Sequence, residues 1–204
     1  MFLVLLAFST ETTDTEGGVA QPVGRHVLDR FKTHATAIGH LVYASARLQW
    51  SLAHLFAALV RPTEQSVPLA IWDAIKSDSN QRNMLRAAAN KVLADRSNIL
   101  EDVLWLLKNS DKLATDRNDA VHTAFFFTTA EDGEIMPVPD PMSNPKRLER
   151  LEDKNLPEKL VLHRDNLTAL YRYADQLTDH LLLDDDERPP YPERPQLSVQ
   201  VDPN

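Results

Sequence analysis

The residues best suited to chemistry lie together in one short stretch of the chain, from Asp116 to His122. The arginine Arg117 is followed at once by the amide Asn118, and an imidazole follows at His122. A guanidinium can bind two anionic oxygens through parallel hydrogen bonds, and an imidazole can accept or donate a proton near neutral pH. The stretch therefore predicts a site that binds an anion and moves a proton, with Arg117, Asn118 and His122 as its residues.

The helical geometry of this stretch leaves two interpretations open. On a regular helix, Asn118 and His122 share a face, whereas Arg117 and His122 are separated by about 140°. Arg117 can reach His122 if its side chain curls toward it at a helix start or kink, or if two subunits bring their motifs together across a two-fold axis. In the other interpretation, Asp119 and His122, three residues apart, simply satisfy one another on a helix surface.

The composition narrows the class of protein. With 204 residues, 43% of them hydrophobic, the chain is long enough for one packed core and too short for two ordinary domains. The lack of cysteine excludes disulfides, thiolate metal sites and a cysteine nucleophile, which fits a cytoplasmic location. A formal net charge of −8 argues against broad, charge-driven binding of nucleic acid, but it is compatible with one local basic site.

Motifs for other chemistries are missing from the sequence. It contains no glycine-rich phosphate loop, no nucleophile-elbow serine and no close set of His, Asp and Glu at metal-ligand spacing. We therefore predict neither a cofactor nor a metal ion. Arg82 and Arg86 share a helix face, for which a solvated surface is the favoured interpretation over an RNA contact.

Helices must position the candidate site. Five Gly against 13 Pro, with the Pro concentrated after residue 137, favour helices separated by Pro-marked breaks. Apolar residues at three- and four-residue steps predict a long helix over 27–60. Its expected buried stripe consists of Leu28, Phe31, Ala35, Ile38, Val42, Ser45, Leu48, Leu52, Leu55 and Leu59.

The same periodicity predicts the remaining helices, over 67–76, over 80–94, from 97 into the candidate site, and over 157–183. The fold class is therefore all-α, a bundle of about four main helices, in which the candidate site lies late in the third or at the start of the fourth.

A small insertion follows the candidate site. Residues 125–130 and 134–138 flank Asp132–Gly133 and predict a hairpin, after which Pro137, Pro139, Pro141 and Pro145 predict a loop.

The two ends of the chain differ from the helical domain, which we place at residues 24–183. Residues 1–23 form an apolar segment and a polar linker, and residues 184–204 form an acidic and Pro-rich tail that we expect to be disordered. The apolar run Phe2–Phe8 has no preceding Lys or Arg and is shorter than the roughly 20 residues of a membrane span. We interpret it as a short strand, a segment that docks on the body, or an artefact of start assignment.

Together, the helical architecture and the stretch Arg117–His122 resemble the HEPN superfamily of RNA-processing and toxin proteins. The family motif is an arginine, a polar residue directly after it, and a histidine four to six residues beyond the arginine, which Arg117, Asn118 and His122 match. A second Arg–His spacing, Arg47 to His54, lacks the polar residue, and we expect it to be structural.

The resemblance implies a homodimer with a composite site that cleaves RNA without metal, within a toxin–antitoxin or defence system. His122 would act as acid or base in an attack by the 2′-hydroxyl, Arg117 would stabilise the phosphate, and Asn118 would orient His122 or bind the phosphate. It also implies an antitoxin of the nucleotidyltransferase type as partner. The alternative is a non-catalytic helical dimer that binds RNA or a protein, which the acidic charge favours, as does Thr123, where many relatives have Gly.

Overall fold

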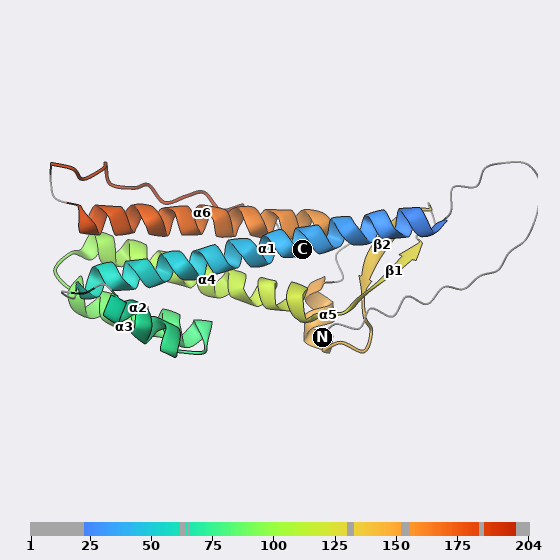
Figure 1. Ribbon diagram of the computed structural model, residues 1–204, viewed down its shortest axis with the longest axis horizontal. Coiled ribbons are helices and arrows are strands. Elements are labelled where there is room, and N and C mark those ends of the chain that lie inside the picture. Colours follow the sequence, from blue (N-terminus) through green and yellow to red (C-terminus); the bar gives the residue numbers. More distant parts are fainter. Residues whose placement is uncertain are drawn as a thin grey trace, which may run out of the picture.

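The computed structural model describes residues 23–61, 64, 66–129, 133–151, 156–183 and 186–198. This part of the chain forms six helices and one two-stranded antiparallel sheet, which confirms a mostly helical protein (Figure 1). The apolar segment Phe2–Phe8 lies outside the described residues. The elements are α1 (Val23–Val60), α2 (Ser66–Ala74), α3 (Asp78–Val92), α4 (Ser97–His122), β1 (Phe125–Thr129), β2 (Ile135–Pro139), α5 (Pro145–Leu151) and α6 (Leu156–Leu182).

Three long helices make the body of the molecule. Helices α1 and α6 run in the same direction side by side, and α4 runs in the opposite direction against them (Figure 1). Helices α2 and α3 cover the second half of α1, and the hairpin β1–β2 lies beside its first half. The last turn of α4, which carries the candidate site, therefore lies near the hairpin end of the bundle.

Leucine side chains from the three long helices fill the core. Leu41, Leu48, Leu52 and Leu55 of α1 are buried against residues of α4 and α6 that repeat at helical spacing. The same core cluster contains Val103, Leu106 and Leu107 of α4 and Leu160, Leu167, Leu170 and Leu177 of α6. Burial of apolar side chains is the main force that holds the bundle together.

The expected stripe of α1 is right in its second half and only partly right in its first, where Phe31 contacts Phe127 and Ile38 packs against the core. Leu48, Leu52, Leu55 and Leu59 are buried, as predicted, but Leu28, Ala35 and Val42 are exposed. The buried face there passes through His34 and Leu41 instead. The reason is that this half of α1 is covered on only one side, by the hairpin and the start of α6.

The predicted hairpin is present and packs on α1. Its register pairs Phe125 with Pro139 and Phe127 with Pro137, and Gly133 in the turn has a φ of 84°, a conformation that glycine adopts at little cost. Because side chains alternate along a strand, Phe125 and Phe127 both contact α1. The ring of His34 lies 4.7 Å from Phe125 and 6.0 Å from Phe127 between centroids, in edge-on geometry.

The loop expected at the prolines contains a helix that the sequence did not reveal. Helix α5 begins at Pro145, whose fixed φ suits a first helical turn. Asn144 precedes it and accepts a hydrogen bond from the backbone N–H of Lys146 (3.1 Å), which caps the helix.

The C-terminal segment was expected to be disordered, and for residues 186–198 this expectation is wrong. The segment runs back along α6 in extended form (Figure 1). The Tyr191 hydroxyl and the Arg194 guanidinium both donate to the buried carboxylate of Asp102 on α4. Ser198 and Asn166 of α6 exchange two hydrogen bonds. Proline disfavours helices but not such an extended, side-chain-anchored path.

Candidate functional site

The candidate residues lie in the last turn of one continuous helix. Helix α4 runs without interruption to His122, so Arg117 is neither at a helix start nor in a separate turn. Asn118 and His122 are both exposed, as expected for residues four apart on one outer face. Between them, Asp119 and Ala120 face the interior and are buried.

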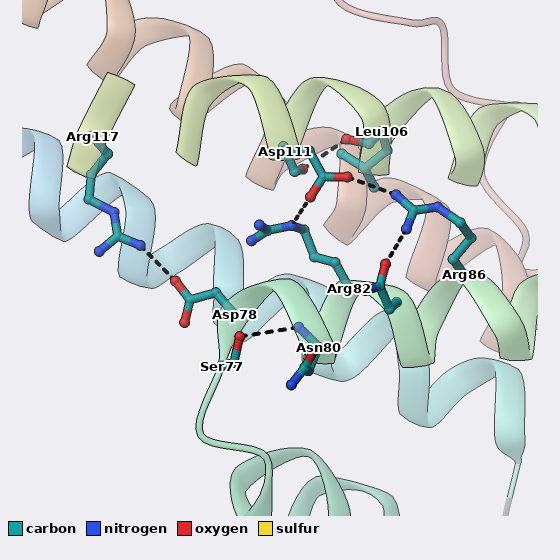
Figure 2. A network of polar contacts seen from close by, with 10 residues as sticks. Ser77, Asp78, Asn80, Arg82, Arg86, Leu106, Asp111 and Arg117 are labelled. Atoms are coloured by element: carbon teal, nitrogen blue, oxygen red, sulfur yellow. Dashed lines mark hydrogen bonds and ion pairs between the residues drawn. The ribbon is translucent and has the colours of Figure 1, made fainter. Parts of the chain in front are cut away.

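Arg117 points away from His122, toward the start of α3. Its Nη2 donates to the Asp78 carboxylate at 2.6 Å, and Figure 2 shows this side chain extended toward the N-terminus of α3. Ser77, which caps α3, lies directly before Asp78. In the described part of the chain, no contact joins Arg117 to His122. Within one subunit, the Arg117 guanidinium and the His122 imidazole are therefore kept apart, as the offset of about 140° between their positions on the helix implies.

Asp119 does not pair with His122 either, which contradicts the second interpretation of the motif. Its carboxylate, only 5% exposed, accepts from Arg150 at 2.5 and 2.9 Å and from Arg147 at 3.3 Å. Both arginines belong to α5. Arg147 also donates to the backbone carbonyl of His122 at 2.9 Å. Helix α5 thus clamps the end of α4 and fixes the backbone that carries the imidazole.

The clamp also affects the arginines themselves. The hydrogen bonds that Arg150 donates to Asp119 raise the pKa of Arg150 above its ordinary value, and nearby carboxylates act in the same direction. A guanidinium is charged at neutral pH even without this help. Sequence reasoning missed this arrangement because nothing in residues 145–151 signals contact with α4 except their positive charge.

Arg82 and Arg86 do not form a solvated face. Both reach across to α4 and bind the two oxygens of Asp111, at 2.5 Å from Arg82 Nε and 2.8 Å from Arg86 Nη2 (Figure 2). The Arg82 side chain is buried at the interface of α3 and α4. These two arginines therefore join α3 to α4, and their positive charge is paired with the Asp111 carboxylate.

A second pair of titratable groups, Asp116 and His163, lies between α4 and α6, and Asp116 directly precedes Arg117 in the chain. The Nδ1 atom of His163 on α6 lies 3.4 Å from the Asp116 carboxylate, without hydrogen-bond geometry. Burial lowers the pKa of His163 and raises the pKa of Asp116. The attraction between the two groups acts in the opposite direction on both pKa values, but it is the smaller effect. The adjoining cavity, lined also by Leu156 and Leu160, measures about 10 Å³, room for about one water molecule. Substrate chemistry therefore has no room there.

The second Arg–His spacing makes no direct Arg47–His54 contact. Both residues pack on Trp50 instead: the Arg47 guanidinium lies 4.9 Å from the ring centroid, and the His54 ring lies 4.0 Å from it.

The described part of the chain contains neither a metal-ligand cluster nor a membrane-spanning helix. There, no three His, Asp or Glu side chains come together in a way that could hold a metal ion. None of the helices described has both the length and the apolar character needed to cross a bilayer.

The arrangement offers an exposed imidazole and amide on one face of α4, beside an arginine that already binds a carboxylate. These groups can transfer a proton and bind an anion, but one subunit does not bring them to a common point. A comparison with protein-family models, with curated proteins and with solved structures gave no match to this chain.

Proposed function

We propose that this protein is a metal-independent endoribonuclease with a HEPN-like helical bundle, and that Arg117, Asn118 and His122 carry its reaction. The observation that supports this best is at the end of α4, where His122 and Asn118 are exposed and Arg117, which directly precedes Asn118, already binds an oxyanion, the Asp78 carboxylate. A phosphate diester presents similar anionic oxygens to an arginine.

In this reaction, the imidazole of His122 takes the proton from a ribose 2′-hydroxyl, and the 2′-oxygen attacks the adjacent phosphorus. The bond from phosphorus to the 5′-oxygen breaks, which leaves a 2′,3′-cyclic phosphate and a free 5′-hydroxyl. Arg117 stabilises the charge that builds on the phosphate oxygens, and Asn118 orients His122 or binds the same phosphate. The leaving oxygen takes a proton from a second imidazole or from water.

Two features of the subunit define what this proposal requires. Because Arg117 and His122 point apart, the site is composite, and Arg117 of one subunit works with His122 of a second one across a two-fold axis. In addition, the phosphate has to displace Asp78 from Arg117. The cellular setting that we propose is a cytoplasmic toxin–antitoxin or defence system with an antitoxin of the nucleotidyltransferase type, which rests on the family resemblance.

A second candidate is a helical dimer that binds RNA or a protein without cutting. The ion pair of Arg117 with Asp78 supports it, because this pair occupies the arginine that catalysis would need.

The test is cleavage of total tRNA and of a mixed RNA pool in the presence of a chelator. We expect cleavage with cyclic-phosphate ends for the wild type and its loss in Arg117→Ala and His122→Ala. Matched controls are Arg86→Ala, which removes another partly exposed, ion-paired arginine, and His26→Ala, which removes another exposed histidine.

Cleavage that persists in both site variants, or that needs added metal, would refute the mechanism. If no variant and no wild type cleaves RNA, but the wild type binds it or a partner protein, the second candidate is the correct one.

A further inference from the structure

A row of aromatic and basic side chains lies on the solvent side of α1, on a face that the core does not use. Its members follow one another at alternating steps of three and four residues, which keeps them on one side of a helix. They are His40, Tyr43, Arg47, Trp50 and His54. Tyr43 is 68% exposed and Trp50 51%. With Tyr171 of the adjacent α6, we call these residues the aromatic row.

Contacts within the aromatic row hold its rings in place. The Arg47 guanidinium lies 4.9 Å from the Trp50 ring centroid and 5.5 Å from that of Tyr171. The His54 ring lies 4.0 Å from Trp50 at an interplanar angle of 49°. Cation–π contacts of this kind order both partners, so Arg47 and Trp50 lose little further side-chain freedom when a ligand binds, and Trp50 and Tyr43 are both exposed to it.

The charge around the aromatic row is unusual for an acidic protein. Although the chain carries a net charge of −8, it contains no Asp or Glu from Arg30 to Thr63. Arg47 forms no ion pair within the described residues, whereas Arg82, Arg117 and Arg150 all bind carboxylates. On α6, Arg172 follows Tyr171, and Asp175 lies one turn farther on without an ion pair.

We propose that the aromatic row binds a single-stranded nucleic acid. Bases stack on Trp50 and Tyr43, which are about 10 Å apart along the helix axis, and Arg47 between them binds a backbone phosphate. Stacking on aromatic side chains next to a cationic group is how proteins hold single strands without reading their sequence. A duplex fits less well, because its bases are already stacked on one another.

A second copy of the chain is a poorer occupant of this surface. A two-fold interface places the same patch on both sides, so the Arg47 side chains of both copies would lie in one interface, with only Asp175 of α6 nearby to offset their charge. Repulsion between the two arginines opposes that arrangement, whereas a phosphate backbone would neutralise the charge of Arg47.

The inference goes beyond the proposed function and does not depend on cleavage. The aromatic row lies on α1 and α6, and the candidate catalytic residues lie at the end of α4. The row explains how a protein with net negative charge can still hold RNA: the local charge and the stacking faces are concentrated on one helix.

The experiment measures binding of a fluorescently labelled single-stranded RNA, a DNA of the same sequence and the corresponding duplexes by fluorescence anisotropy. All proteins carry His122→Ala, so that cleavage does not interfere. We expect Trp50→Ala to weaken binding of the single strands by about tenfold and Trp50→Phe to restore most of it. Arg47→Gln should lower the salt dependence of binding by the share of one phosphate contact.

The matched control is Phe126→Ala, which removes an equally exposed aromatic ring (49%) on the hairpin. It should leave affinity unchanged. Equal binding by wild type and Trp50→Ala, with or without RNA cleavage in the parent protein, would overturn the inference. The inference would also be overturned if Trp50→Ala altered the oligomeric state of the protein but not its affinity for RNA, since the aromatic row would then join two copies of the chain. Weaker RNA binding in this variant supports the inference even if the chain never cleaves RNA.

Discussion

Removal of the Asp119 carboxylate should destabilise the fold more than any other change near the candidate site. Asp119 is 5% exposed and accepts three hydrogen bonds from the guanidinium groups of Arg147 and Arg150. Asp119→Ala breaks all three and leaves Arg147 with only the backbone carbonyl of His122 as acceptor.

The size of the effect follows from the exposure of the partners. Hydrogen bonds to charged groups contribute about 1.5–3 kcal/mol each when fully buried, but the two arginines are 27% and 46% exposed and regain water. We therefore expect a net loss of about 2 kcal/mol in the free energy of unfolding, which corresponds to about 4–8 °C in Tm for a chain of this size. By contrast, Asp78→Ala breaks a pair whose carboxylate is 41% exposed and should cost about 0.2–1 kcal/mol.

Urea denaturation followed by circular dichroism measures both values, with Asp119→Asn as a variant that keeps the side-chain volume. Arg150→Ala alone should cost less than Asp119→Ala, because Arg147 still binds the carboxylate. If Asp119→Ala changes the free energy of unfolding by less than about 0.5 kcal/mol, a value typical of ordinary surface changes, the clamp of α5 on α4 does not exist in solution.

Three further predictions concern the site, a buried histidine and the C-terminal segment. Asp78→Asn should raise the rate of RNA cleavage, because it frees Arg117 for phosphate; a rate equal to or below that of the wild type would speak against displacement of Asp78 by substrate. Burial lowers the pKa of His34 below its ordinary 6.5, so the unfolded chain binds more protons below that pH. The free energy of unfolding should therefore fall as the pH drops through about 6.5, and His34→Gln should flatten this slope in denaturation curves at several pH values. Asp102→Ala should release the C-terminal segment, so that a glutamate-specific endoprotease cuts after Glu193 faster than in the wild type; equal cleavage rates would show that Asp102 does not anchor it.

The sequence determined the elements whose signal is local. Periodic leucines predicted the long helices to within a few residues, because apolar side chains that repeat every 3.6 residues can all be buried on one side only if the segment is an α-helix. The Asp132–Gly133 turn between aromatic and proline-rich segments predicted the hairpin, whose strands Phe125–Thr129 and Ile135–Pro139 lie where expected. The cluster Arg117–His122 and the offset of about 140° between its arginine and histidine on a regular helix also followed from sequence and helical geometry, whereas the direction of the Arg117 side chain, toward Asp78, did not.

Only the tertiary structure decided which partner each polar group has. Asp119 binds arginines of α5, Arg117 binds Asp78, and Asp102 holds the C-terminal segment, all across long separations in the chain. No periodicity encodes such contacts, because an ion pair depends on which helices lie side by side and on their rotation about their axes. The same reason explains why the stripe of α1 was wrong at Leu28, Ala35 and Val42: which face is buried in the first half of α1 depends on the hairpin and α6, and not on α1 itself.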